Sequence, residues 1–438
     1  MLPHAVENLR AFLSSSVARK WTSQGSLCSC EILPARPREL PAGVAEGSIL
    51  VEHQPIRFPN YPYEWSPEML RAAGELTLRL ALESLRAGFL LKDATPYNIM
   101  FEGLRPVFLD VLSFAPRDPL DPIWPPYAQF VRTFVYPLVA GVSCGAQIGE
   151  LLLSHRDGLT PDRVAHMLGA RRFLPRFLAS VALPALLSNR DREASRPRST
   201  HRTAARDAHE SEYVLASRFR KAQRLLPQLP AARSTYLDRD CIYSASEFAA
   251  KKGAVAETLE RFRPQFVLDI GCNDGQFSLL AAGFGAAVVA IDRDPSAAGA
   301  LWNSAQGHAI LPLVIDIARP PGACGWANAE FPSFLDRARG RFDCVLMLAL
   351  LHHLSVDERV PLPWIFDLAA QLTRRLLIAE YVDPADPQFQ TLARGRDALH
   401  RDLTVRAFED AARERFLIVE SRRITPTRAI YVLEHENR

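Results

Sequence analysis

A glycine-containing turn follows a strand-like apolar run in the second half of the chain. The run FVLDI at 266–270 leads into the turn GCNDG, which contains Gly271, Asn273 and Gly275. Glycine permits positive φ and close approach of a ligand to the backbone, and the helix expected after the turn has a positively polarised N-terminus. We therefore expect this turn to hold an anionic group. Its spacing, Gly-x-Asn-x-Gly, differs from the G-x-G-x-x-G pattern of dinucleotide-binding folds.

Two further acidic residues end apolar runs. Asp292 ends the run AVVAID, and a carboxylate at such a strand end can accept hydrogen bonds from both hydroxyls of a ribose. The same charge would repel a 2′-phosphate. Asp316 ends the run ILPLVID and could contact an adenine amino group. The alternative interpretations are a strand-end cap for Asp292 and an ordinary loop carboxylate for Asp316.

Adjacent histidines, His352 and His353, directly follow the apolar run at 342–350. Histidine accepts a proton near neutral pH, so either ring could serve as a general base toward a hydroxyl or ammonium group. In the alternative interpretation, one ring packs against a bound ligand and the other caps a helix. Glu380 and Tyr381, after the next run, are further candidates for a substrate pocket.

These residues must be positioned by alternating strands and helices. Helical patterns separate most of the apolar runs, which predicts an α/β fold with a parallel sheet covered on both faces. The runs FLIVESRR and RAIYVLEH are separated only by ITPT, too short for a crossover helix, and should pair in antiparallel fashion. The expected strands lie at 266–270, 287–292, 310–316, 342–350, 375–381, 416–423 and 428–435.

The motifs VLDIGCNDG, VVAIDRD, LPLVIDI and FDCVLMLALLHHL, with the terminal strand pair, resemble class I S-adenosylmethionine (SAM)-dependent methyltransferases from about residue 243 to residue 434. One departure is Asn273, where many members have glycine, although asparagine tolerates left-handed backbone. The resemblance implies a Rossmann-like sheet with an antiparallel last strand and SAM as the cofactor.

The resemblance also implies roles for particular residues. The region of Asp269 and Gly271 would serve the methionine end of SAM, Asp292 the ribose, and Asp316 with Ile317 the adenine. Because methyl transfer from a sulfonium has a good leaving group, proximity and alignment can supply most of the acceleration. A general base is therefore not essential.

The first half carries a second constellation, Asp93, Asn98 and Asp110, near short strand-like pieces. Its spacing resembles the catalytic loop and metal-binding Asp of protein-kinase-like folds, which would make Asp93 the base and place Asn98 and Asp110 on Mg²⁺. However, Leu91-Lys92 replaces the usual His-Arg or His-Gly, and no glycine-rich loop precedes it. We therefore favour a mostly helical, kinase-C-lobe-like scaffold or substrate-binding domain; chance spacing in a helical domain is the alternative.

A polar stretch at 188–212, dense in Arg, Ser, Asp and Thr, reads as a linker. It predicts a kinase-like helical domain at 1–187 and a methyltransferase domain at 213–438. This two-part arrangement resembles bacterial methyltransferases of the nodulation-protein-like type.

The bulk composition is that of an ordinary globular chain: 438 residues, 48% hydrophobic and 23% charged, with a net charge of +3. So small a charge does not favour nucleic acid as a partner. The seven cysteines are scattered, without C-x-x-C pairs, so we expect reduced thiols in a cytoplasm and no zinc site. The longest uncharged apolar run is too short for a bilayer, so no membrane partner is expected.

Together these patterns predict a bacterial two-domain cytoplasmic enzyme that binds SAM and methylates a small-molecule acceptor. The sequence leaves the acceptor and the oligomeric state unassigned. Three alternatives stay open: a phosphotransferase using Asp93, Asn98 and Asp110, a non-catalytic SAM or nucleotide sensor, and an NAD-dependent oxidoreductase.

Overall fold

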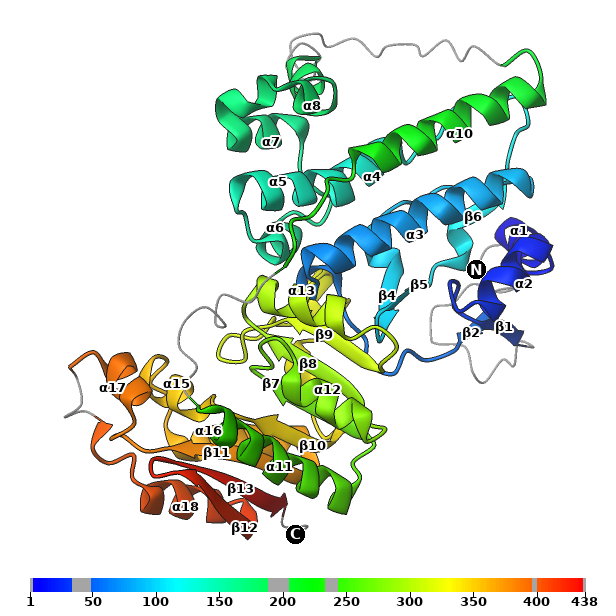
Figure 1. Ribbon diagram of the computed structural model, residues 1–438. Helices are drawn as coiled ribbons and strands as arrows, with labels where there is room; N and C mark the ends of the chain where they lie inside the picture. The colour runs from blue at the N-terminus through cyan, green and yellow to red at the C-terminus, as the bar shows by residue number, and fades with distance from the viewer. Residues whose placement is uncertain (1–2, 34–48, 188–204, 233–242, 396–399, 436–438) are drawn as a thin grey trace. The chain divides into compact units, whose positions relative to one another are not determined.

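The chain divides into two compact units, Met1–Pro230 and Ala231–Arg438 (Figure 1). The computed structural model describes residues 3–33, 49–187, 205–232, 243–395 and 400–435. Most of the expected linker, residues 188–204, lies outside the described residues. Its last part does not form a free connection, because helix α10 (Ala208–Leu225) begins there and packs against α3 (Pro67–Arg86) of the first unit.

The second unit is built on a seven-stranded sheet in the order β12-β13-β11-β10-β7-β8-β9. Neighbouring strands from β9 to β11 are parallel, whereas β13 is antiparallel to both β11 and β12. The predicted antiparallel terminal pair is therefore confirmed, as is the α/β fold with its Rossmann-like sheet. The strands are β7 (Phe266–Ile270), β8 (Ala287–Asp292), β9 (Ile310–Val314), β10 (Phe342–Met347), β11 (Thr373–Val382), β12 (Phe416–Thr425) and β13 (Arg428–His435).

Helices connect the parallel strands and pack against the sheet (Figure 1). Nearly every residue of the central strands is buried, on both sides of the pleat, which requires cover on both faces. The helices are α11 (Ala245–Phe262), α12 (Gln276–Gly283), α13 (Pro295–Ser304), α14 (Phe334–Ala338), α15 (Leu351–Val356), α16 (Leu362–Leu372), α17 (Pro387–Ala393) and α18 (Val405–Arg413).

Local sequence explains where several of these elements begin and end. Ser244 and Glu247 form the expected capping box of α11, with the Ser244 hydroxyl accepting from the Glu247 amide. Strand β10 is shorter than the apolar run that predicts it, because Ala349 takes left-handed backbone with φ 53°. Strand β9 likewise ends at Val314, two residues before Asp316.

The first unit is mostly helical, and its described residues form three two-stranded antiparallel sheets. Ser66 caps α3 and Pro67 occupies its first turn, as the sequence predicts, and the helix buries a broad leucine face. The strands are β1 (Cys30–Leu33), β2 (Leu50–His53), β3 (Phe89–Leu91), β4 (Ile99–Glu102), β5 (Arg105–Phe108) and β6 (Phe114–Pro116). Besides α3 and α10, the α-helices are α1 (Pro3–Leu13), α2 (Ser16–Ser23), α4 (Tyr127–Phe130), α5 (Tyr136–Cys144), α6 (Ile148–Ser154), α7 (Pro161–Leu168) and α8 (Pro175–Phe177).

None of the helices within the described ranges is both long and apolar enough to cross a membrane.

Candidate active site

The turn after β7 is held in a strained shape that its residue types permit. Gly271, Asn273 and Gly275 have φ values of 73°, 51° and 83°. The backbone N–H groups of Gly271 and Cys272 both donate to the carbonyl of Ile291 on β8, at 2.8 and 3.1 Å. Gly275 lies at the N-cap of α12, where a Cβ would meet the Leu301 side chain at 2.2 Å. The turn thus needs glycine at 275 for both φ and space.

Asp292 faces this turn from the end of β8. Its Oδ2 accepts from the Asn273 N–H at 2.9 Å and its Oδ1 from the Asp294 N–H at 2.9 Å. Burial raises the pKa of this carboxyl above its usual value, although the two backbone hydrogen bonds oppose the shift. Each carboxylate oxygen keeps a second acceptor position, so the group can still bind a pair of hydroxyls. The acid and the turn therefore fit the ribose and the amino-acid end of a nucleoside such as SAM.

Asp269 is placed differently, inside the sheet. Its side chain is buried on β7, and its Oδ2 accepts from the Ser278 hydroxyl at 2.6 Å. Burial raises the pKa of Asp269 to about 6. Its described contact therefore joins β7 to the first half of α12 and holds the turn between them.

Asp316 and Ile317 follow β9. The Oδ1 of Asp316 accepts from the Ala318 N–H at 3.0 Å, while its Oδ2 pairs with Arg319 at 3.0 Å. Arg319 also pairs with Glu358 at 2.6 Å, so Asp316 belongs to a surface ion-pair group. Ile317 is buried.

The two histidines of α15 are unequal. His352 is 5% exposed, and its Nδ1 has no hydrogen-bond partner among the described residues. Burial, followed by the charges of His353 and Arg428, lowers the pKa of His352 well below its usual value. His353 is less buried, and its Nδ1 lies 3.3 Å from Oδ2 of Asp357. Burial lowers the pKa of His353 as well, so both rings are neutral near pH 7.

A cavity of about 20 Å³ adjoins His352, next to the carboxyl end of β11. The buried hydroxyl of Ser355, which also lines it, has no partner within the described part of the chain. Such a volume holds about one water-sized group. The full lining is Leu351, His352, Ser355, Leu362, Glu380, Tyr381, Val382, Phe389, Leu403 and Phe408.

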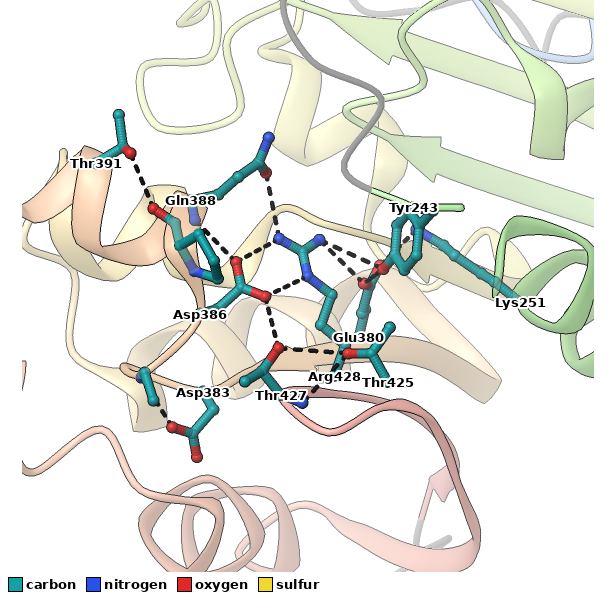
Figure 2. A network of polar contacts seen from close by, with 12 residues as sticks. Tyr243, Lys251, Glu380, Asp383, Asp386, Gln388, Thr391, Thr425, Thr427 and Arg428 are labelled. Atoms are coloured by element: carbon teal, nitrogen blue, oxygen red, sulfur yellow. Dashed lines mark hydrogen bonds and ion pairs between the residues drawn. The ribbon is translucent and has the colours of Figure 1, made fainter. Parts of the chain in front are cut away.

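Glu380, which lines this cavity, also belongs to a buried network of charged side chains (Figure 2). Glu380, fully buried at the end of β11, pairs with Lys251 of α11 at 2.6 Å and accepts from the hydroxyl of Tyr243. Arg428 of β13 lies 3.6 Å from Glu380 and binds both carboxylate oxygens of Asp386, at 2.7 and 2.8 Å. The two cations and two anions compensate one another, which burial of charge requires.

Sequence reasoning missed most of this network. Glu380 was a pocket candidate, but its partners Tyr243, Lys251 and Arg428 were not. One signal was available for Lys251, because it falls on the apolar face of α11, three residues after Phe248 and four before Val255. A charge at such a position must have a buried partner.

The structure brings two of the three kinase-like residues of the first unit to one cavity. Asn98 and Asp110 line a cavity of about 500 Å³, whereas Asp93 is not among its described lining residues. Asp110 accepts from the Ser113 hydroxyl and the Leu112 N–H at 2.6 and 3.0 Å. The described lining includes no lysine or arginine for a triphosphate.

No group of three or more His, Cys, Asp or Glu side chains gathers as a metal site among the described residues.

Comparison with known proteins shows the family to which the chain belongs. A family model described as a methyltransferase domain matches residues 243–404. The nodulation protein NoeA of Rhizobium meliloti (strain 1021) is 30% identical over 406 residues, which cover 89% of this chain and 83% of NoeA.

Two solved structures are also similar to part of the chain. WbdD is 19% identical with a TM-score of 0.32, and the match covers 47% of this chain but only 45% of WbdD. Magnesium protoporphyrin IX methyltransferase from Synechocystis PCC 6803, solved with bound SAM, is 18% identical with a TM-score of 0.33, over 46% of this chain and 92% of that protein. By its similarity to NoeA and its methyltransferase domain, the chain belongs to the NoeA family and is a SAM-dependent methyltransferase.

Proposed function

We propose that the second unit methylates an oxygen or nitrogen atom of a small-molecule acceptor at the carboxyl edge of β7, β10 and β11. The observation that carries this proposal is His352: a buried, neutral imidazole whose Nδ1 has no partner among the described residues, beside a cavity at the carboxyl end of β11. Ligands of open α/β sheets bind outside the carboxyl ends of the strands. The cavity has the size of a hydroxyl or amino group rather than of a whole molecule.

We assign the cofactor contacts to the turn and the neighbouring strand ends. Asp292 would accept hydrogen bonds from the ribose hydroxyls, and the turn at 271–275 would hold the amino-acid end. Asp316 and Ile317 would contact the adenine, and Asp269 would keep the turn in place through Ser278. When bound, SAM supplies an electrophilic methyl group on a sulfonium.

His352 would act on the acceptor. A neutral imidazole can take the proton that a hydroxyl loses as its oxygen forms the new bond to carbon, or the proton that an ammonium group must lose before its nitrogen can form that bond. His353 would fix the orientation of this pair, because Asp357 restrains its ring and the two ring centroids lie 4.4 Å apart. The burial of His352 would keep water away from the reacting atoms.

The first unit would select or present the acceptor. Its cavity of about 500 Å³ falls in the range typical of small-molecule sites. The cysteines of the described ranges form no disulfide, which supports a reducing, cytoplasmic location.

Calorimetric titration with SAM and S-adenosylhomocysteine, followed by transfer of labelled methyl from SAM to a panel of hydroxyl- and amine-bearing small molecules, tests the proposal. We expect both nucleosides to bind and label to appear in at least one acceptor. If SAM binds but label is transferred neither to the panel nor to metabolites of a cell extract, the protein is a SAM sensor instead. Absence of binding would refute the cofactor assignment as well.

A further inference from the structure

An exposed apolar surface lies on residues 173–187 of the first unit, in the part of that unit that carries α7 and α8 (Figure 1). It includes α8 and the π-helical turn η6 (Leu178–Ala182), and we call it the leucine surface. The exposed fractions are 57% for Phe173, 42% for Leu174, 42% for Leu178, 48% for Leu183, 59% for Leu186 and 54% for Leu187. So many large apolar side chains exposed on one short stretch usually mark an interaction site.

The leucine surface is a firmly held element rather than a loose end. Its opposite side buries Phe177, Val181 and Ala182, and η6 packs against α7. The Tyr136 hydroxyl donates to the carbonyl of Ser180 at 2.8 Å, and Arg171 donates to the carbonyl of Ser143 at 2.7 Å. The leucines face outward because the opposite side of this segment packs into the core.

Only positive charge accompanies these leucines. Arg171 and Arg172 directly precede the leucine surface and Arg176 lies within it. No Asp or Glu occurs between Asp162 and Asp191. The guanidinium of Arg172 stacks over the ring of Phe173 at 4.8 Å, so its aliphatic stem follows the apolar surface. An apolar face edged by arginine, without acidic residues, is typical of segments that lie in the headgroup region of a membrane.

Other occupants fit this pattern less well. The residues that follow in the chain, 188–204, contain no large apolar side chain and so cannot cover leucines. A second copy joined by two-fold symmetry would place the arginines of one chain near those of the other. An anionic lipid surface complements both the apolar and the positive character.

We propose that the leucine surface docks the protein on anionic membranes, as a contact in the plane of the headgroups and without a membrane span. The apolar side chains enter the boundary between headgroups and acyl chains, and the arginines pair with lipid phosphates. This inference does not depend on the methyl acceptor.

Flotation of the full chain with vesicles tests the proposal. We expect the protein to float with vesicles of phosphatidylcholine mixed with phosphatidylglycerol, and much less with phosphatidylcholine alone. The variant Leu186→Ser/Leu187→Ser should reduce the bound fraction about tenfold, since each leucine loses its transfer from water. The variant Arg171→Gln/Arg172→Gln/Arg176→Gln should remove the preference for anionic lipid and its salt dependence.

Leu417→Ser is the matched control, because Leu417 is 57% exposed on β12 of the second unit. It should leave flotation unchanged. The proposal is wrong if the wild-type protein does not float with anionic vesicles. It is also wrong if the Leu186→Ser/Leu187→Ser variant floats as well as the Leu417→Ser control. If the protein self-associates in gel filtration, the Leu186→Ser/Leu187→Ser variant does not, and neither binds vesicles, the surface is a contact between copies. Binding of an acidic protein instead of vesicles would also overturn the proposal.

Discussion

The Oδ2 atom of Asp292 accepts a hydrogen bond of 2.9 Å from the backbone N–H of Asn273. The end of β8 and the middle of the turn after β7 are thereby joined through one carboxylate. The group that would bind a ribose also holds the turn that would bind the rest of the nucleoside. Loss of this carboxylate should therefore affect cofactor binding in two ways at once.

Replacing Asp292 should weaken SAM binding more than it weakens the fold. In Asp292→Asn the amide oxygen can still accept one of the two backbone hydrogen bonds, from Asn273 or from Asp294. The amide nitrogen cannot accept the other, so that hydrogen bond is lost together with the negative charge. We expect the Kd for SAM, measured by calorimetry, to rise about 10- to 100-fold. Asp410→Asn, at an exposed acid of α18, serves as the control, and an unchanged Kd in Asp292→Asn would contradict the assignment.

Replacing His352 should separate chemistry from cofactor binding. We expect His352→Gln to lower kcat about 100-fold while the affinity for SAM stays near the wild-type value. His308→Gln, at an exposed histidine of the same unit, should leave both unchanged. If His352→Gln retains full kcat, alignment alone drives the reaction and His352 is no base.

The pH profile follows from the lowered pKa of His352. The neutral ring is the active form, so activity should persist as the pH falls through 6.5, the ordinary value for histidine, and disappear only at lower pH. Folding stability has the same direction, because below pH 6.5 the unfolded state binds a proton that the buried ring resists. Measurement of kcat from pH 8 to pH 5 checks this; an acid limb centred near pH 6.5 would show an exposed base instead.

Asp269 should have the opposite pH linkage. Its folded pKa of about 6 exceeds the ordinary 3.8, so the native state binds more protons between these values and the stability conferred by this group falls as the pH rises. In Asp269→Asn the amide oxygen can still accept from Ser278, and the linkage is removed. We expect the free energy of unfolding of the variant, minus that of the wild type, to be larger at pH 7 than at pH 4 by on the order of 3 kcal/mol, measured by urea unfolding. An equal difference at both pH values would refute a raised pKa.

The Lys251–Glu380 pair should be costly to break on one side. Lys251→Met removes the closest cation from a fully buried carboxylate, and we expect a loss of about 3–5 kcal/mol in the free energy of unfolding. The double variant Lys251→Met/Glu380→Gln should recover part of this loss, because the buried carboxylate of Glu380 is then removed together with its lysine partner. Lys252→Met, at the adjacent exposed lysine, is the control. A single variant as stable as wild type would mean that Arg428 alone compensates Glu380.

Much of the second unit could be read from local pattern. Strands β7, β8 and β13 have the predicted bounds, and the short ITPT gap correctly indicated antiparallel neighbours. These successes share a cause, since periodicity, glycine turns and loop lengths act over a few residues. The apolar runs ending at Asp316 and before His352 were read too long, because hydrophobicity continues past the residue at which pairing stops.

By itself the sequence determined the succession of strands along the chain, the turn at 271–275 and the acid that ends β8, because each depends on neighbours along the chain. Only the tertiary structure decided which charges are compensated. Lys251 and Glu380 are 129 residues apart in sequence yet 2.6 Å apart in space, and Arg428 comes from the last strand. It also decided that His352 is buried with a nitrogen that no described residue contacts by a hydrogen bond, while His353 has a carboxylate beside it. Burial and long-range distance set the pKa of a group, and neither is encoded in the residues that flank it.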